Sequence, residues 1–544
     1  MKKRHLYLLH RWLGIVLCIF FALWFISGVI MLYARMPLLF PSERYAGLET
    51  LDFARIQISP QQAWDRLGKP EANPGKARLV MSLNRPVYLF NSKGEKWQGI
   101  FADTGEQLEP VTVEQGAREA QRFLNRETLP VHVNTFDGID QWTFSNSMNL
   151  HRPLHRYRFD DANRTEVYVS AVTGEVVNKT TQGERWSAAV GAYLHWLAPS
   201  LLRREVTVWR NFLLYLSLAG TILAVTGMVI GVLRYRREGY PNRTGLGAKL
   251  PYRGVMAWHA WTGLLFGVTT LTWIFSGFLY MNPGGTKSGP LSTVTTVTPY
   301  NEGGIRADLS PKPEQSKAFS GGALEMNLFQ VLPGDAWATA KGITDATAPV
   351  KEVTLLRFAG KPYYLFHRTD TDSWLVSGAT VSADAKSMFS VEELVAQAEK
   401  AVPGAKLTEA TLLTEYDAYY YAVGAVAPKR LPILRLQYDD LPGTWLYVKP
   451  FDGSIFRRYD HHGRLMRWLV NGLHCLDFPF LIKNRPLWDI AIIGLSLGGL
   501  VLSVAGIIIG GKRLRMEMQT GKPKPAPRKS SSVNSSATIN ETLP

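Results

Sequence analysis

Four of the eleven histidines recur at matching places in two halves of the sequence, and imidazole is a common ligand of transition metals. These four are His10, His259, His195 and His474. His10 and His259 stand in long apolar stretches, where an ionisable side chain is uncommon and usually faces the interior of a helix bundle. Each is followed four residues later by a glycine on the same helical face, Gly14 or Gly263, which would leave room for a flat macrocycle.

Two imidazoles that face one axis form the ligand set of a six-coordinate haem iron, and four-helix bundles hold cofactors between facing helices in this way. We therefore predict one haem between His10 and His259 and a second between His195 and His474. Zinc or copper is the alternative metal, but neither pair has a Cys or carboxylate at ligand spacing, which disfavours tetrahedral zinc. A structural role at the helix ends is the alternative without a metal.

An internal repeat defines these pairs. An offset of 249 residues matches the first apolar stretch to the third with six identities in nineteen positions, including His10 with His259. A second alignment, at an offset of 279 residues, includes His195 with His474, Asp161 with Asp440, Tyr168 with Tyr447, Trp209 with Trp488 and Gly227 with Gly506. Each half then has one outgoing helix, one outer domain and one returning helix. Parallel repeats of this kind are related by an approximate two-fold axis along the membrane normal.

Four stretches are apolar over the roughly 20 residues that cross a bilayer. They comprise residues 6–32, 212–233, 255–281 and 490–509. The segments 188–202 and 464–482, which carry His195 and His474, are expected to be short helices at the outer interface, with Trp209 and Trp488 where the returning spans begin. The sequence thus predicts an integral membrane four-helix bundle built from two parallel repeats.

The distribution of charge predicts the orientation. The N-terminus, the loop between the second and third spans, and the C-terminal tail hold sixteen Lys and Arg residues but three acids, and so account for thirteen of the sixteen net positive charges. Lys and Arg concentrate on the cytoplasmic side of membrane proteins, so both termini are expected in the cytoplasm. Because the excess charge lies beside the spans, it does not indicate a nucleic-acid-binding surface.

The other seven histidines have no counterpart in the other half of the chain. His151 with His155, at helical i, i+4 spacing, and the adjacent His461 and His462 could bind a substrate metal or line a docking surface. Solvated surface residues are the alternative.

The two outer segments alternate apolar and polar residues in short runs with Gly turns, as in TEVYVSAVTGEVV, WQGIFADTGEQLE and TWLYVKPFDGSIF, which predict hairpins. Residues 113–125 and 391–402 have helical periodicity. Two α+β domains are therefore expected outside the membrane.

A family resemblance rests on these segments. The strand and turn around Tyr168, Gly174 and Glu175, repeated at Tyr447 and Gly453, resemble the PepSY domain signature. The segments LHRWLGIVLCIFFALWFISGVIMLY and RPLWDIAIIGLSLGGLVLSVAG resemble the PepSY-associated transmembrane, or iron-regulated membrane protein, family. The resemblance extends over nearly the whole chain, up to about Arg515.

That family includes di-haem ferrisiderophore reductases of the bacterial inner membrane. The resemblance implies that His10, His195, His259 and His474 bind two b-type haems and that electrons pass outward to reduce a ferric siderophore or another ferric chelate in the periplasm. Some relatives end in a cytoplasmic flavin reductase domain, whereas this chain ends in a short polar tail. A quinol or a separate cytoplasmic reductase is therefore the expected electron donor.

The expected division of the chain follows from these features. The first span lies in residues 1–36, a periplasmic PepSY-like domain in 37–208, the second span in 209–234, a cytoplasmic loop in 235–254, the third span in 255–281, a second PepSY-like domain in 282–487, the fourth span in 488–511 and a disordered tail in 512–544. The alternative function is a haem-free, membrane-anchored PepSY module that binds periplasmic peptidases or senses the envelope. A transporter is disfavoured, because the spans carry no charged residues in their middles.

Overall fold

The computed structural model describes residues 3–34, 36–68, 73–92, 94–143, 146–199, 202, 205–241, 249–281, 309–340, 349–381, 384–422 and 429–520. Within these residues, four helices are long and apolar enough to cross a membrane. They are α1 (Lys3–Tyr33), α7 (Val206–Arg234), α8 (Val255–Tyr280) and α15 (Arg485–Thr520). The protein is therefore a multi-pass membrane protein, and all four predicted spans are helical.

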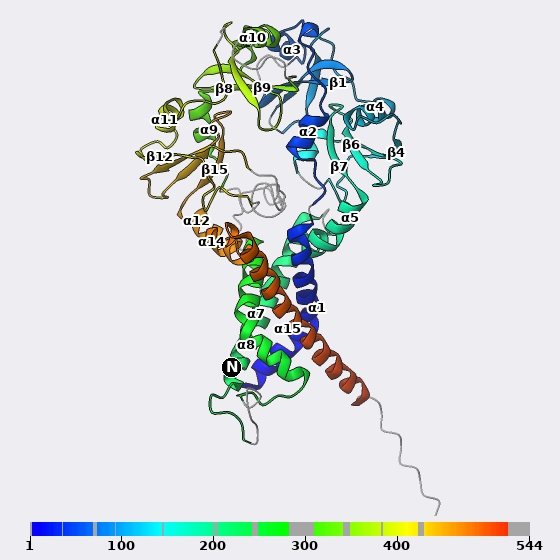
Figure 1. Cartoon of the computed structure of the whole chain (residues 1–544), viewed down its shortest axis with the longest axis vertical. Helices are drawn as coiled ribbons and strands as arrows, with labels where there is room; N and C mark the ends of the chain where they lie inside the picture. Colours follow the sequence, from blue (N-terminus) through cyan, green and yellow to red (C-terminus); the bar gives the residue numbers. More distant parts are fainter. Residues whose placement is uncertain are drawn as a thin grey trace, which may run out of the picture.

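The four long helices form a bundle at one end of the molecule (Figure 1). α1 and α8 each pack against both α7 and α15. Glycines permit the closest approaches: a Cβ atom at Gly499 would lie 2.2 Å from the Phe25 ring, and one at Gly220 would lie 2.8 Å from Ile274. Small residues of this kind are what let membrane helices pack without a hydrophobic driving force.

α15 extends beyond its predicted span. It continues through Thr520, so residues 512–520, expected in a disordered tail, are helical. Arg513 and Glu517 are four residues apart and form an ion pair at 2.9 Å, which supports this last part of the helix. Residues 521–544 of the predicted tail lie outside the described residues.

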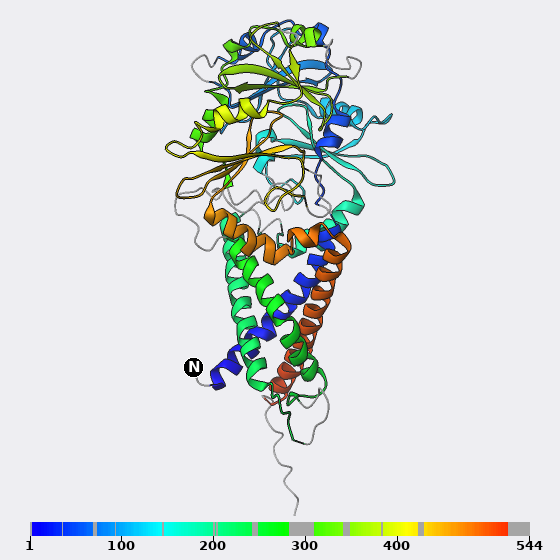
Figure 2. The ribbon, with the colours of Figure 1, turned by 60° about the vertical axis from the view of Figure 1, so that its left-hand side comes forward.

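The described residues form three antiparallel sheets, which lie beyond the bundle and above it in Figure 2. The first half contributes β1 (Lys76–Ser82), β2 (Arg85–Asn91), β3 (Gln98–Phe101), β4 (Val131–Phe136), β5 (Leu154–Arg158), β6 (Glu166–Ser170) and β7 (Val176–Thr180). The second half contributes β8 (Glu352–Phe358), β9 (Lys361–His367), β10 (Ser373–Ser377), β11 (Ala385–Lys386), β12 (Leu407–Leu413), β13 (Ile433–Tyr438), β14 (Trp445–Val448) and β15 (Ile455–Tyr459). The predicted hairpins are confirmed at β6–β7 and β14–β15.

The third predicted hairpin, in WQGIFADTGEQLE, is confirmed only in part. β3 forms its first arm, and the second arm reaches it through a single bridge between Ile100 and Gln107.

Short helices cover the sheets or pack against the long helices of the bundle. The first half contains α2 (Pro41–Gly47), η1 (Phe53–Arg55), α3 (Pro60–Asp65), α4 (Val113–Phe123), η2 (Asn146–His151), α5 (Gln182–Ala188) and the π-helix η3 (Ala189–Tyr193). The second half contains α9 (Pro313–Ser320), η7 (Met326–Leu328), α10 (Pro333–Ala340), α11 (Val391–Ala398), α12 (His461–Arg467), the π-helix η8 (Trp468–Gly472), α13 (Leu473–Cys475) and α14 (Pro479–Ile482). Among these short helices, η3, η8, α13 and α14 pack against the long helices of the bundle. The helices predicted at 113–125 and 391–402 are confirmed as α4 and α11, which end two and four residues early.

One sheet joins the two halves of the chain. It has the strand order β11-β10-β9-β8-β1-β2-β3, and its centre is the antiparallel pair β1–β8, in which Arg78 lies opposite Thr354. One face is covered by α3 and α10, which bury Trp64 and Trp337 against Tyr88 and other core residues. The other face packs towards the two four-stranded sheets, β4-β5-β6-β7 and β12-β13-β14-β15. The sequence did not predict that the two outer segments share a sheet.

A buried ion network lies at this junction. Glu175, in the β6–β7 turn, accepts from Arg78 at 2.6 Å and from Arg44, in α2, at 3.1 Å, while Arg44 also pairs with Glu352 at the start of β8. Burial alone would raise the pKa of Glu352, but Arg44 and Arg78 outweigh it and lower the pKa from 4.5 to about 2. The network therefore holds α2, close after the first span, to both halves.

We predict that Glu352→Gln lowers the free energy of unfolding by about 3–5 kcal/mol near neutral pH, because two buried guanidinium groups keep only one carboxylate. The folded-state pKa of Glu352 lies below its unfolded value of 4.5, so its contribution is present above that pH and is lost as the pH falls towards 2. Chemical unfolding in detergent, followed by Trp fluorescence, should show the difference between variant and parent shrinking over this range.

The matched control is Glu314→Gln, which removes an exposed carboxylate 3.9 Å from Lys312 and should leave stability unchanged. A difference between the Glu352 variant and its parent that persists undiminished at pH 2 would contradict this account.

Candidate site: two pairs of facing histidines

The structure brings the four recurring histidines together in two pairs. His10 in α1 and His259 in α8 have ring centres 6.2 Å apart, with their planes inclined at 47°. His195, in the helical turn after η3, and His474, in α13, have ring centres 6.0 Å apart and planes inclined at 71°. Each pair takes one imidazole from each half of the chain.

Every imidazole of these pairs is held through Nδ1 by its own half. His10 Nδ1 lies 3.2 Å from the carbonyl of Leu223, and His259 Nδ1 lies 3.2 Å from the carbonyl of Leu502. In the other pair, Nδ1 of His195 lies 3.2 Å from Ser27 Oγ and Nδ1 of His474 lies 3.0 Å from Ser276 Oγ. A hydrogen bond at one ring nitrogen orients the imidazole and leaves Nε2 as the nitrogen available to a metal.

The ring separations match a shared metal ion. A first-row metal such as zinc binds an imidazole nitrogen at about 2.0–2.1 Å, and a ring nitrogen lies about 1.1 Å from the ring centre, so two imidazoles opposite each other on one ion have centres about 6.3 Å apart. The ring-centre separations of 6.2 and 6.0 Å are close to this value. Among the described residues, no group of three or more His, Cys, Asp or Glu side chains is placed to hold a metal, so a site built only from protein ligands would have two.

The two pairs lie towards opposite ends of the bundle. His10 and Ser27, which contacts His195, are seventeen residues apart in α1, and His259 and Ser276 are seventeen residues apart in α8. At a rise of about 1.5 Å per residue this is about 25 Å along each helix, comparable with the hydrocarbon core of a bilayer. We call His10 with His259 the tail-side pair and His195 with His474 the sheet-side pair.

Irregular helices position the sheet-side pair. The segment before each histidine contains a π-helix, η3 or η8, a form that is rare and often found at functional sites. After each histidine the chain turns through a left-handed residue, Leu197 or Leu476. Trp209 and Trp488, at the starts of α7 and α15, close these turns by donating their indole N–H to carbonyls at Trp196, Leu197 and Cys475.

Two glycines of the returning helices adjoin the tail-side pair. A Cβ atom at Gly227 would lie 2.7 Å from Cε1 of His10, and one at Gly506 would lie 2.6 Å from Cys18 Sγ and 3.5 Å from Cε1 of His259. The sequence alone did not place these glycines at the site, although the 279-residue repeat pairs them as it pairs His195 with His474. Gly14 and Gly263 meet only leucine and cysteine atoms at 3.6 Å or more, so their predicted role beside a macrocycle stays a prediction.

Three of the unpaired histidines, His151, His155 and His461, contact neighbouring side chains or backbone. Both ring nitrogens of His155 are hydrogen bonded, Nδ1 with Thr135 Oγ1 at 2.7 Å and Nε2 with the Val111 carbonyl at 2.8 Å. His151 stands beside Trp97, and burial lowers its pKa to about 4. His461 contacts Arg464 at the start of α12. Solvated surface is wrong for His155, which is buried, while His151 is half-buried. The helical i, i+4 spacing predicted for the two is also wrong, because His151 ends η2 and His155 lies in β5.

The model of the PepSY-associated TM region matches residues 7–513, which include all four paired histidines and most of each helix of the bundle. The chain belongs to this family. The comparison with curated proteins gives no match. Membership of the PepSY-associated TM family agrees with four spanning helices combined with separate α+β sheet regions outside them.

We predict that Gly227→Ala destabilises the bundle by about 1–3 kcal/mol, because the added methyl group overlaps the imidazole of His10, which hydrogen bonds to Leu223 and cannot move freely. Gly494→Ala in α15 is the matched control, since nothing lies within 4 Å of its Cβ position. Thermal unfolding in detergent compares the two, and equal midpoints would show that Gly227 does not make room for the ring.

Proposed function

We propose that the protein is a di-haem b electron-transfer protein that carries electrons across its membrane to a ferric chelate such as a ferric siderophore. The observation that supports this most is the pairing of four imidazoles, at ring separations of 6.2 and 6.0 Å, near the two ends of one bundle. Bound haem supplies one-electron transfer at each site. The proposal makes the protein a ferric-chelate reductase.

The protein's part is to hold and orient the ligands. The carbonyls of Leu223 and Leu502 fix the tail-side imidazoles, and the hydroxyls of Ser27 and Ser276 fix the sheet-side imidazoles. Because each ring is anchored in its own half, both Nε2 atoms of a pair can meet between the halves. The apolar side chains around α1 and α8, including Phe21, exclude water between the two sites.

A duplicated architecture accounts for this symmetry. We propose that the halves are parallel repeats related by a two-fold axis along the membrane normal, which passes between the two histidines of each pair and through the β1–β8 junction. The carbonyls of Leu223 and Leu502 stand at the 279-residue offset, and the hydroxyls of Ser27 and Ser276 stand at the 249-residue offset. Equivalent groups therefore hold the imidazoles in both halves: a leucine carbonyl at the tail-side pair and a serine hydroxyl at the sheet-side pair.

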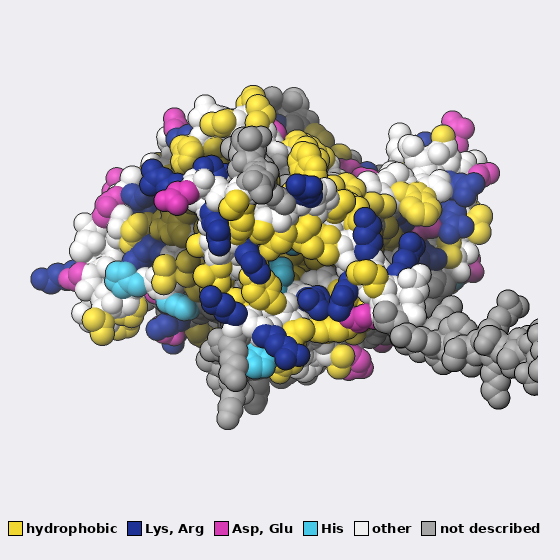
Figure 3. All heavy atoms as spheres, turned by 90° about the horizontal axis from the view of Figure 1, so that it is seen from below, with side chains coloured by type: hydrophobic (Ala, Val, Ile, Leu, Met, Phe, Trp, Pro, Cys, Tyr) yellow, Lys and Arg dark blue, Asp and Glu magenta, His cyan; other side chains and the backbone are white. Residues whose placement is uncertain are grey.

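The orientation follows from the charges at the tail side. Figure 3 looks onto this end of the molecule, where Lys and Arg side chains gather. The exposed bases include Arg4, Arg236, Arg237, Lys512 and Arg515. The positive-inside rule supports the proposal that this end faces the cytoplasm. The sheets would then lie in the bacterial periplasm, with the sheet-side pair near the substrate.

The substrate follows from the family resemblance and from iron chemistry. Oxygen-rich chelators hold Fe(II) less tightly than Fe(III), so delivery of one electron releases iron from the chelate for uptake. A quinol or a separate cytoplasmic reductase is the proposed electron donor.

The test is the visible spectrum of the purified protein before and after dithionite. We expect the spectrum of low-spin b-type haem, with two haems per chain. His10→Ala or His259→Ala should remove the tail-side haem, and His195→Ala or His474→Ala the sheet-side haem, each leaving about half of the total in a protein that still inserts.

His132→Ala is the control, because this histidine lies on β4 at the edge of a four-stranded sheet and should not affect haem content. A colourless preparation from haem-replete cells would refute the proposal and favour a haem-free PepSY module.

A further inference from the structure

The same turn and helix contact occurs beside each four-stranded sheet. In the first half, Asp161 closes the turn before β6 by accepting from Thr165 N and Thr165 Oγ1, both at 2.8 Å. In the second half, Asp440 closes the turn before β14 by accepting from Thr444 N and Thr444 Oγ1, both at 2.6 Å. Each turn ends in a left-handed residue, Arg164 or Gly443.

The helix that follows each sheet begins on this turn. The first amide of α5, at Gln182, donates to the carbonyl of Asn163 at 2.8 Å, and the first amide of α12, at His461, donates to the carbonyl of Pro442 at 2.9 Å. Thr181 and Asp460 cap the two helices by accepting from the amides of Glu184 and Gly463.

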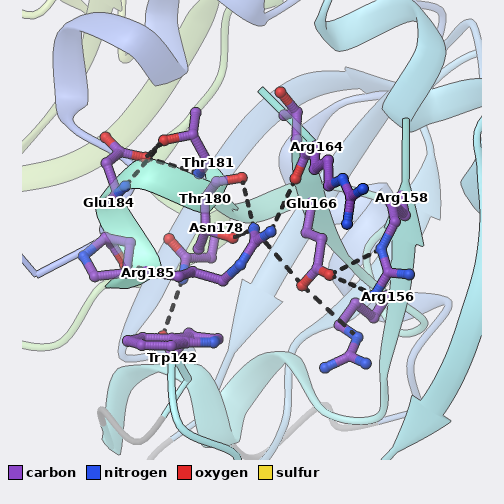
Figure 4. Close-up of polar contacts among 12 residues, drawn as sticks. Trp142, Arg156, Arg158, Arg164, Glu166, Asn178, Thr180, Thr181, Glu184 and Arg185 are labelled. Carbon is purple, nitrogen blue, oxygen red and sulfur yellow. Dashed lines mark hydrogen bonds and ion pairs between the residues drawn. The ribbon is translucent and has the colours of Figure 1, made fainter. Parts of the chain in front are cut away.

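One arginine then locks each helix onto its turn. Arg185 donates from Nη2 to the Arg164 carbonyl at 2.9 Å and from Nη1 to Thr180 Oγ1 at 2.7 Å, as Figure 4 shows. Arg464 donates from Nη1 to the Gly443 carbonyl at 2.6 Å. These pairs of residues stand at the 279-residue offset, so the contact is the same in both halves. We call Arg185 or Arg464 with its turn the arginine latch.

We infer that the two arginine latches position the sheet-side histidines: Arg185 acts through its helix on His195, and Arg464 acts through its helix on His474. This inference rests on the proposed function, because it concerns the ligands of the sheet-side haem. The residues are positioning residues, since neither arginine touches an imidazole of the pair.

A continuous helical segment connects Arg185 to His195, so that fixing one end restrains the other. α5 runs without a break into η3 and the turn with His195, ten residues after Arg185, which is about 15 Å along the helix. At Gly191 the helix touches α1, where a Cβ would lie 3.3 Å from the backbone nitrogen of Met31. A segment fixed at its start by the latch and in its middle by α1 has little freedom to rotate its last turn.

The two latches differ in what surrounds the arginine. In the first half, Glu166 lies 3.8 Å from Arg185 and pairs with Arg158 at 2.9 Å. In the second half the matching position is Trp445, and Arg464 lies over its ring at 4.5 Å. An ion pair supports one latch and a cation–π contact supports the other. Each latch can therefore be loosened separately.

The experiment compares Arg185→Gln and Arg464→Gln with Arg158→Gln. Arg158 also pairs with Glu166 but makes no contact with the turn carbonyl, so it is the matched control. Electron paramagnetic resonance of the oxidised protein reports the angle between ligand imidazole planes at each haem. We expect both latch variants to shift the signal of the sheet-side haem while the tail-side signal and the Arg158→Gln spectrum stay unchanged.

Hydrogen exchange gives a readout that does not need haem. Loss of one latch hydrogen bond should make amides of residues 182–195, or of residues 461–475, exchange about fivefold faster, each in its own variant only. Arg185→Lys and Arg464→Lys, which keep the charge and one donor, should restore part of the protection.

The outcomes separate the two claims. A protein without haem refutes the proposed function, and the exchange measurement then still tests the latch. Unchanged sheet-side spectra together with unchanged exchange would overturn the inference. If the Gln variants fail to insert, Glu166→Gln and Trp445→Leu take their place, with smaller shifts of the same signal expected, and no shift in either would also overturn it.

Discussion

Each paired imidazole is fixed through Nδ1 by its own half of the chain and faces its mate in the other half. His10 and His259 are held by backbone carbonyls of the returning helices, and His195 and His474 by serine hydroxyls of the outgoing helices. Packing the spans in any other order would break these contacts. The arrangement of the bundle, the π-helices and the tryptophans that close the following turns together bring each of these histidines to face its mate in the other half.

The sequence was sufficient for the parts of the fold that repeat or that have a strong period. Four apolar stretches predicted four helices, Gly174 and Gly453 predicted two hairpins, and the offsets of 249 and 279 residues matched the histidines that the structure places together. The internal repeat helped to find candidate site residues, because a residue that recurs in both halves can be recognised without any alignment to other proteins. The family assignment was confirmed, while haem binding and ferric reduction stay predictions.

Long-range contacts between unlike residues could not be predicted. The pairing of β1 with β8 depends on two strands more than 270 residues apart, and nothing in either strand marks it as the centre of a shared sheet. The network of Arg44, Arg78, Glu175 and Glu352 has no counterpart under the repeat. The repeat already paired Asp161 with Asp440, which lie in the two latch turns. The role of Arg185 and Arg464 is visible only in the structure, where their guanidinium groups donate to the turn carbonyls.

The most direct test of the central claim is electron transfer across a membrane. The protein would be reconstituted in vesicles with an impermeant reductant inside and a ferric chelate with an Fe(II) indicator outside. The account predicts Fe(II) outside vesicles that contain the parent protein, and none above the protein-free rate with His10→Ala or His195→Ala, since each pair is needed at its own membrane face. Undiminished Fe(II) formation by either variant would contradict it.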